Sequence, residues 1–257
     1  MSTLDVELIP ALSDNYIHLI HAPATGTTGV VDPAEAGPVL AALERRGLKL
    51  DFILNTHHHP DHVGGNLALK AATGATIVGP TADAARIPGI DVQLGDGDSW
   101  RFGDQPVKVF DVPGHTRGHI AFWFPDGQAV FVGDTLFSLG CGRLFEGTPE
   151  QMQVSLSKLA ALPPDTRVYC AHEYTQSNAR FALSVEPHNA ALRRRSAEVD
   201  RLRAEGKSTI PSTIGLELET NPFLRWASPE IQQSVGLLGG LPAAVLGETR
   251  RRKDNFR

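Results

Sequence analysis

The chain has 257 residues, with 24 Lys and Arg against 29 Asp and Glu, so its formal net charge at pH 7 is −5. This mildly acidic balance argues against a basic nucleic-acid-binding protein. A content of 41% hydrophobic and 21% charged residues excludes a disordered chain. We therefore expect a folded globular protein, built as one large domain or as a larger domain with a smaller companion.

Targeting and membrane signals are not found in the sequence. The first ten residues lack a basic segment followed by an apolar run, so they do not predict an export signal. The longest apolar stretch, at 235–246, is interrupted by glycine and proline and is too short to cross a bilayer. The two cysteines, Cys141 and Cys170, match neither a disulfide framework nor a zinc motif. We expect a cytoplasmic protein that does not associate with membranes.

Up to about residue 171, short runs rich in Val, Ile and Phe alternate with Gly, Pro and Asp turns and with a few helical patterns. This alternation predicts a mixed α/β domain. The predicted strands are 5–8, 16–21, 29–31, 52–54, 76–78, 107–112, 120–124, 129–132 and 168–170. The predicted helices in this part are 36–46, 65–72 and 149–162.

The character of the chain changes after residue 173. Helical spacing dominates, at 177–183, 190–205 and 242–253, and no further strands are predicted. The charge changes as well: residues 1–175 hold 11 basic and 20 acidic side chains (net −9), and residues 176–257 hold 13 and 9 (net +4).

These shifts predict a mixed α/β domain at 1–173 and a smaller, mildly basic helical domain at 174–257. We interpret the basic run Arg193, Arg194 and Arg195 as the solvated face of a helix.

The strongest local signal is the segment from Thr56 to His62, which directly follows the predicted strand 52–54. Residues two apart in an extended segment point the same way, so His57 and His59 can converge on one point while His58 faces elsewhere. Asp61 and His62, beyond a proline turn, can face a second point. Imidazole and carboxylate ligands suit zinc, manganese or iron.

Three further candidates have the same position relative to a strand. His115, Asp134 and His172 each lie just past the end of a predicted strand. Open α/β sheets place their ligand sites at the carboxyl ends of strands, so these side chains can meet the histidine segment.

The candidates are too many for one ion. One zinc takes three or four protein ligands, and a larger set suits two ions that share a bridging carboxylate, which we assign to Asp134. The predicted metal ligands are His57, His59, Asp61, His62, His115, Asp134 and His172. Taken singly, each could instead be a turn aspartate or a buried core histidine.

Other polar residues near this set receive supporting roles. We expect His58 and His119 to support ligands or to pack. Asp32 could orient a ligand or cap a turn. Cys141 and Cys170 are interpreted as packing residues.

With these residues the sequence resembles the metallo-β-lactamase superfamily, whose hallmark is a His-x-His-x-Asp-His segment, here 57–62. The order and spacing of His115, Asp134 and His172 also fit. The resemblance implies an α/β fold, a four-layered αβ/βα sandwich with a two-metal site at one edge. The resemblance makes 1–173 the catalytic domain, joined here to a smaller C-terminal helical, substrate-binding domain at 174–257.

Within that superfamily the chain resembles glyoxalase II, the hydroxyacylglutathione hydrolases, over nearly its whole length. The similar segments are 141–148, 172–175, 221–225 and 250–256. The resemblance implies that substrate is contacted by Arg143, Phe145, Tyr174, Arg250 and Lys253. Some family members have Lys and Tyr at the positions of Arg143 and Phe145, so one hydroxyl contact is absent here.

The implied activity is hydrolysis of the thioester of S-D-lactoylglutathione, a 2-hydroxyacylglutathione, to glutathione and D-lactate, the second step of methylglyoxal detoxification. A metal-bridged hydroxide would be the nucleophile, and Asp61 and Asp134 the catalytic carboxylates. The cofactors would be two divalent ions, zinc first, with iron or manganese as alternatives. We expect a monomer whose partner is this small molecule, and no nucleic acid.

Other functions remain as alternatives at this point. A lactonase shares the two-metal site and is disfavoured only by the segments that resemble glutathione contacts. A β-lactamase would lack the helical tail. A nucleolytic member of the superfamily would need a basic surface, whereas the metal domain is acidic. A non-enzymatic metal-binding protein would bind metal without turnover.

Overall fold

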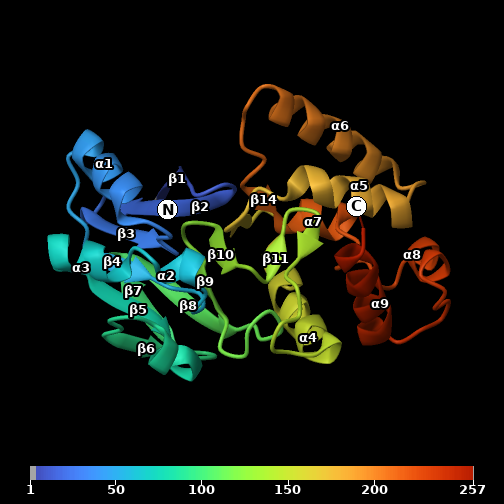
Figure 1. Cartoon of the computed structure of the whole chain (residues 1–257), viewed down its shortest axis with the longest axis horizontal. Helices are drawn as coiled ribbons and strands as arrows, with labels where there is room; N and C mark the ends of the chain where they lie inside the picture. Colours follow the sequence, from blue (N-terminus) through green and yellow to red (C-terminus); the bar gives the residue numbers. More distant parts are fainter. Residues whose placement is uncertain (1–3, 257) are drawn as a thin grey trace. The chain divides into compact units, whose positions relative to one another are not determined.

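The computed structural model describes residues 4–256, which form two compact units (Figure 1). Among these residues, the first unit comprises those up to Asp111 and Arg117–Gly133, and the second comprises Val112–Thr116 and those from Asp134 on. Residues 1–3 and 257, at the ends of the two domains predicted from sequence, lie outside the described residues. The predicted boundary between 173 and 174 rests on composition rather than on packing, and it stays a prediction.

The first unit contains most of the strands. Its elements are β1 (Asp5–Ala11), β2 (Asn15–Ala22), β3 (Thr27–Val31), α1 (Ala36–Arg46), β4 (Phe52–Leu54), α2 (Pro60–Val63), α3 (Asn66–Thr73), β5 (Thr76–Pro80), the 3₁₀ helix η1 (Thr81–Arg86), β6 (Val92–Leu94), β7 (Ser99–Phe102), β8 (Gln105–Asp111), β9 (Ile120–Phe124) and β10 (Ala129–Gly133).

One sheet of this unit has the order β1-β2-β3-β4-β5-β6. β1, β2 and β3 pair antiparallel, and β3 to β6 pair parallel. Parallel strands need crossover connections, which α1 and α3 provide between β3, β4 and β5. Helix α1 buries Val39, Ala42 and Leu43, and α3 buries Leu69, in one apolar cluster with the sheet residues.

A second sheet of the same unit contains β7, β8, β9 and β10, paired antiparallel in that order. Aromatic side chains fill the space between the two sheets. Phe52 of β4 contacts Phe102 of β7, and Phe124 of β9 contacts Phe102 and Phe131, with ring centroids 5.5–5.9 Å apart. Tilted and edge-on aromatic pairs of this kind add to the apolar burial.

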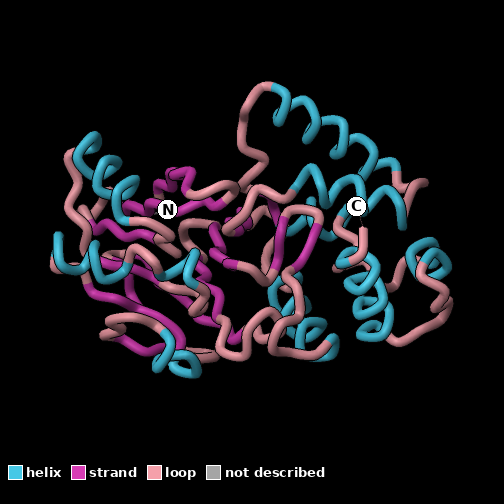
Figure 2. Tube along the Cα trace, viewed as in Figure 1, coloured by secondary structure: helices cyan, strands magenta, loops and turns pink. Residues whose placement is uncertain are grey.

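The second unit is mainly helical, as the cyan tubes in Figure 2 show. Its elements are β11 (Leu136–Phe137), β12 (Gly140–Cys141), α4 (Pro149–Ala160), β13 (Arg167–Cys170), α5 (Thr175–Val185), α6 (Ala190–Ala204), β14 (Ser212–Thr213), α7 (Ile214–Thr220), α8 (Pro229–Ser234) and α9 (Pro242–Asp254). β11 and β12 form a hairpin, and β13 pairs with β14. Among residues 4–256, no helix combines the length and apolar character needed to span a bilayer.

Two expectations about the C-terminal part are wrong. β14 is a short strand beyond residue 173, because two residues are enough to pair with β13 but too few to show a period. Arg193 and Arg194 are exposed, as expected, whereas Arg195 is buried in an ion pair with Glu217. Successive helical residues point 100° apart, so one of three consecutive arginines can face the interior, where a buried carboxylate can pair with it.

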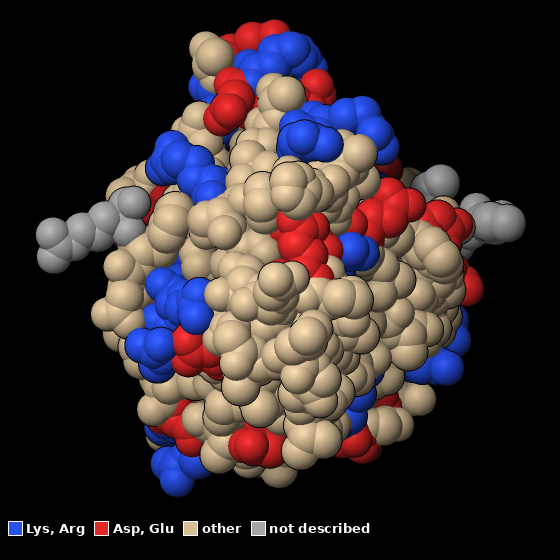
Figure 3. Space-filling view, turned by 90° about the vertical axis from the view of Figure 1, so that its right-hand side faces the viewer, with Lys and Arg blue, Asp and Glu red and all other residues tan. Residues whose placement is uncertain are grey.

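The face shown in Figure 3 carries basic side chains in separate groups with acidic side chains between them. On α6, Arg201 pairs with Glu198 and Glu205, which lie three and four residues away. Pairs at this spacing stabilise an exposed helix only slightly. Their opposite charges offset one another locally along the helix.

Candidate metal centre and substrate pocket

The histidine segment begins where β4 ends, beside the end of β3. Val31 and Leu54 are paired in the parallel ladder, so Asp32 and Thr56 emerge at the same edge of the sheet. The buried Asp32 carboxylate accepts hydrogen bonds from the Thr56 amide (2.8 Å) and from the Thr56 hydroxyl (2.6 Å). Asp32 therefore fixes the start of the segment.

His57 is fully buried and held at one nitrogen. Its Nδ1 lies 3.0 Å from the Thr56 hydroxyl, which donates its own proton to Asp32 and so accepts from Nδ1. This assigns the proton of neutral His57 to Nδ1 and leaves the Nε2 lone pair for a ligand. The His119 ring stacks on the His57 ring at 4.5 Å, which agrees with the predicted packing role of His119.

The separation of His57 and His59 suits a shared cation. His57 Nε2 and His59 Nδ1 lie 3.1 Å apart. Two nitrogens bound to one tetrahedral zinc are about 3.3 Å apart, given Zn–N bonds of about 2.0 Å. His58, between them, faces away and contacts Asp83 at 2.9 Å, as the alternation of an extended segment predicts.

His62 and Asp61 form a second pair of donors. His62 Nδ1 is 3.1 Å from Asp32, and His62 Nε2 is 3.5 Å from Asp61 Oδ2. Asp61 in turn accepts a hydrogen bond of 3.1 Å from Asn15. Donor atoms of Asp32, His57 and His62 lie within 4.8 Å of one another. Because Asp32 already accepts from Thr56, we assign it the role of orienting His62.

The second unit contributes a carboxylate between two imidazoles. Asp134 directly follows β10, and its Oδ2 lies 3.4 Å from His115 Nε2 while its Oδ1 lies 3.4 Å from His172 Nε2. These distances exceed the 2.7–2.9 Å of a charge-assisted hydrogen bond and are close to the spacing of two ligands on one ion. This arrangement is the one expected of a carboxylate that bridges two metals.

Both imidazoles beside Asp134 are oriented by neighbouring groups. His115 Nδ1 donates to the backbone carbonyl of Arg143 at 2.8 Å, so its Nε2 is the nitrogen that faces Asp134. The His172 ring stacks on the Tyr174 ring, with centroids 4.7 Å apart and planes 1° apart. Imidazole nitrogens and carboxylate oxygens held in this way fit a divalent cation.

Each unit thus brings together the predicted ligands that it contains. The first unit groups His57, His59, Asp61 and His62, and the second groups Asp134 with His115 and His172. The assignment of all seven to one two-metal centre remains a proposal.

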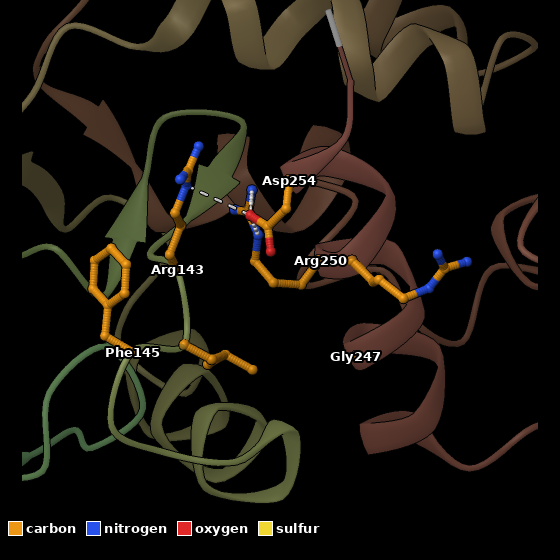
Figure 4. Close-up of a pocket in the computed structure, with 7 residues that line it drawn as sticks. Arg143, Phe145, Gly247, Arg250 and Asp254 are labelled. Atoms are coloured by element: carbon orange, nitrogen blue, oxygen red, sulfur yellow. Dashed lines mark hydrogen bonds and ion pairs between the residues drawn. The ribbon is translucent and has the colours of Figure 1, made fainter.

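A pocket of 370 Å³ lies within the second unit, between the loop after β12 and helix α9 (Figure 4). Small-molecule sites usually measure about 300–1,000 Å³. The lining residues are Arg143, Leu144, Phe145, Gly247, Arg250, Arg251 and Asp254. Figure 4 shows Arg143 reaching toward Asp254, whose carboxylate lies 3.6 Å from Arg143 Nε.

Arg250 is the least accessible of the predicted substrate cations. Its guanidinium is buried, donates to the carbonyl of Cys141 at 2.7 Å, pairs with Asp254 and lies over the Phe223 ring. Arg143 is different, because 63% of its side chain is exposed. A carboxylate that enters the pocket therefore meets Arg143 before it meets Arg250.

Lys253, on the same helix, is half-buried. Its Nζ donates to Ser177 Oγ at 2.9 Å. Burial, followed by the nearby charges of Arg250, Arg180 and Arg143, lowers the pKa of Lys253 to about 8. The neighbouring arginine charges that contribute to this shift also attract an incoming anion.

Several residues around the site were not recognised from sequence. Asn15 contacts Asp61, and Arg86 contacts both His58 and Asp83. These partners lie far from the histidine segment in sequence and belong to residue types that are common on surfaces, so no local spacing reveals them. Cys141 and Cys170 are buried, free thiols, as predicted.

Comparison with known protein families finds two matches along the chain. Residues 19–172 match the metallo-beta-lactamase superfamily, and residues 173–256 match the hydroxyacylglutathione hydrolase C-terminus. A hydroxyacylglutathione hydrolase of Methylococcus capsulatus is 60% identical over 254 residues, which cover 99% of both chains.

Solved structures show the same fold. ETHE1 from Myxococcus xanthus has a TM-score of 0.67 at 26% identity, covering 98% of this chain and 100% of that chain. A protein solved in a di-iron-bound form has a TM-score of 0.61 at 28% identity, covering 86% and 100%. The predicted α/β fold of the metallo-β-lactamase type, with a helical C-terminal region, is confirmed. By the extent and identity of these matches, the chain belongs to the hydroxyacylglutathione hydrolases of the metallo-beta-lactamase superfamily.

Proposed function

We propose that this protein hydrolyses the thioester of 2-hydroxyacylglutathiones, with S-D-lactoylglutathione as the substrate, and releases glutathione and D-lactate. The observation that carries the proposal is the Asp134 carboxylate, whose two oxygens face His115 and His172. The name of the Methylococcus capsulatus relative, a hydroxyacylglutathione hydrolase, supports the substrate class.

The proposed cofactors are two divalent ions, zinc first, with iron or manganese as alternatives. The imidazoles and carboxylates of the two donor groups support this choice, as does the similar protein that was solved in a di-iron-bound form. When bound, the ions supply Lewis acidity and bring the pKa of coordinated water close to neutrality. The residues that would bind these ions are His57, His59, Asp61, His62, His115, Asp134 and His172.

The protein's own residues would orient the donors and the substrate. Asp32 holds His62, and the Arg143 carbonyl holds His115, so the metal-facing nitrogens are set before substrate arrives. The exposed rings of Phe145 and Tyr174 contact His115 and His172 respectively. We propose that these two rings border the thioester.

The cations of the second unit would bind the glutathione moiety. Glutathione carries two carboxylates, and Arg143, Arg250 and Lys253 supply charges that can pair with them. The departing thiolate belongs to a thiol with a pKa of about 8.5, so it leaves without a strong general acid. No serine or cysteine nucleophile is needed, and both cysteines are buried.

We further propose a cytoplasmic monomer whose partner is this small molecule. The two free, buried cysteines are compatible with a reducing compartment.

The test follows loss of thioester absorbance with purified protein and S-D-lactoylglutathione, before and after a chelator removes metal. We expect turnover that the chelator abolishes and that zinc restores. A D134N variant removes the charge of the proposed bridging carboxylate while keeping the size of the side chain. Its turnover should be at least about a hundredfold lower than that of wild type.

Absence of thioester hydrolysis from protein shown to hold two metals would contradict the substrate assignment. A lactone substrate, tested under the same conditions, would then identify the alternative activity of the same site. Turnover that survives complete metal removal would contradict the metal assignment.

A further inference from the structure

The β11–β12 hairpin connects two parts of the proposed site. Asp134 lies two residues before the hairpin, and Arg143 lies two residues after it. The carbonyl of Arg143 accepts the His115 hydrogen bond. The placement of this hairpin therefore sets both the proposed bridging carboxylate and the group that orients His115.

The hairpin backbone is held by a side chain from the end of α7. The buried Asn221 Nδ2 donates to the Phe137 carbonyl (3.1 Å) and to the Gly140 carbonyl (3.0 Å). Phe137 and Gly140 face each other in the hairpin, next to its turn. Backbone carbonyls in a buried turn need such partners, and Asn221 is 81 or more residues away in sequence.

A second contact reaches the turn itself. Leu139, between the two strands, has φ of 59°, a left-handed conformation that non-glycine residues rarely adopt. Its amide donates to Glu217 Oε2 at 2.9 Å. Such backbone conformations persist when the surroundings hold them in place.

Glu217 is fully buried and occupied at both oxygens. Oε2 accepts from Leu139 and from Asn221, and Oε1 accepts from Arg195 and from Ser212. A buried carboxylate of this kind is tolerated only when it is paired and fully hydrogen-bonded. Its charge is compensated by Arg195, and its hydrogen bonds hold the hairpin turn.

We infer that Glu217, acting with Asn221, is a positioning residue for hydrolysis, because it fixes the β11–β12 hairpin and thereby the placement of Asp134 and of the Arg143 carbonyl. This inference rests on the proposed function for its catalytic consequence. Its structural part, the dependence of metal binding on Glu217, stands without any substrate.

The chain offers a matched control in the same unit. Glu186 is also a buried carboxylate paired with an arginine: Arg225 donates to its two oxygens at 2.8 Å each, with further bonds from Asn189 and Ser228. None of the hydrogen bonds that Glu186 makes within residues 4–256 reaches the hairpin. The variants E217Q and E186Q therefore remove equivalent charges, and only one of them touches the hairpin.

The experiment compares wild type, E217Q, N221A and E186Q. N221A keeps the Arg195–Glu217 pair and removes the two hairpin contacts, together with the bonds of Asn221 to Glu217 and to the Phe223 amide. It therefore tests the inference even where E217Q does not fold. We would measure zinc affinity by chelator competition, hydrogen exchange of a peptide covering 136–142, melting temperature, and kcat and KM.

For E217Q and N221A we expect zinc affinity to fall at least about tenfold, exchange of the hairpin amides to accelerate, and kcat to fall at least about tenfold with KM within about threefold. E186Q should lower the melting temperature and leave the other values as in wild type.

Two results would overturn the inference. One is wild-type zinc affinity and kcat in E217Q and N221A despite a lowered melting temperature. The other is an equal loss of zinc affinity in E186Q, which would indicate general destabilisation. Failure of the proposed function would appear differently, as a wild-type protein that binds zinc and does not hydrolyse the thioester.

Discussion

Asp61 is a predicted metal ligand whose carboxylate accepts a hydrogen bond from Asn15. Replacement by Asn keeps the size of the side chain and an oxygen that can accept from Asn15, but removes the negative charge. We expect D61N to lower turnover by at least about a hundredfold and to reduce bound metal. Turnover and metal content by elemental analysis provide the measurement, with the exposed Asp126→Asn as control. Wild-type turnover in D61N would remove Asp61 from the proposed site.

Lys253 predicts a pH dependence of substrate binding. Burial and neighbouring arginines lower its pKa to about 8, so the amine is charged below pH 8 and becomes neutral above it. If Lys253 binds a glutathione carboxylate, KM should rise as pH increases from 7 to 9. K253R keeps its charge over this range, so its KM should stay level. Parallel pH profiles of KM in the two proteins would contradict the assignment.

The pH dependence that Lys253 gives to stability is opposite to the one it gives to substrate binding. A lysine whose pKa is lower in the folded than in the unfolded chain is costly to fold in its charged form. Its contribution to stability therefore improves as pH rises through about 8 toward the unfolded value. Because Lys253 is only half-buried, solvent screening keeps this effect small.

At the scale of elements, α4 supports the loop that carries His115. Ser155 donates to the Pro113 carbonyl at 2.7 Å, and the Gly147 amide donates to the Gly114 carbonyl at 3.1 Å. Gly114 has φ of 146°, and a Cβ there would meet Met152 at 2.9–3.2 Å. The loop therefore requires glycine for its conformation and for its packing.

We expect Gly114→Ala to lower zinc affinity at least about tenfold and to reduce the melting temperature by more than a matched glycine change. The matched control variant is Gly47→Ala at the end of α1, where φ is 64° and nothing lies within 4 Å of the new Cβ. Strain alone costs G47A about 1–2 kcal/mol, a few degrees in melting temperature. Equal effects of the two variants on zinc binding would refute the role of the loop.

The elements that were predicted correctly share a clear period or a clear ending. Helix α1 was predicted with its observed bounds, because its apolar spacing ends at Gly47 in the left-handed conformation. Strand β4 and the last three residues of β3 are apolar runs, typical of buried parallel strands. β7, α7 and α8 were not predicted. β7 and α8 are too short to establish a period. In α7 the buried Glu217 stands where the sequence suggests an exposed position, so the apolar period of this helix is obscured.

The same contrast applies to the site. The spacing of the histidine segment reveals its chemistry because its donors are neighbours in sequence. Asn15, Asn221 and Glu217 act on residues 46 to 84 positions away, and their residue types are ordinary. Only the folded chain shows that they support the donors or the hairpin.

For the whole molecule, the proposed ligands extend from His57 to His172 along the chain, so the unfolded chain does not present the site. Metal should therefore bind the native state more tightly than the unfolded state. At a free zinc concentration of about 100 times Kd, the native state gains about 2.7 kcal/mol, or about 5–10 °C in melting temperature. Thermal melts with zinc, with a chelator and with Ca²⁺, which prefers oxygen ligands, provide the measurement. Identical melts with zinc and with the chelator would contradict the proposed centre.

The two buried thiols have a consequence for an enzyme that releases glutathione. Burial raises the pKa of Cys141 to about 11 and that of Cys170 to about 12. At pH 7 about one Cys141 in ten thousand is then a thiolate, and thiol–disulfide exchange proceeds through the thiolate. Glutathione disulfide that accumulates around the protein therefore finds no reactive sulfur at these two positions, and the protein is spared mixed disulfides with the oxidised form of its own product.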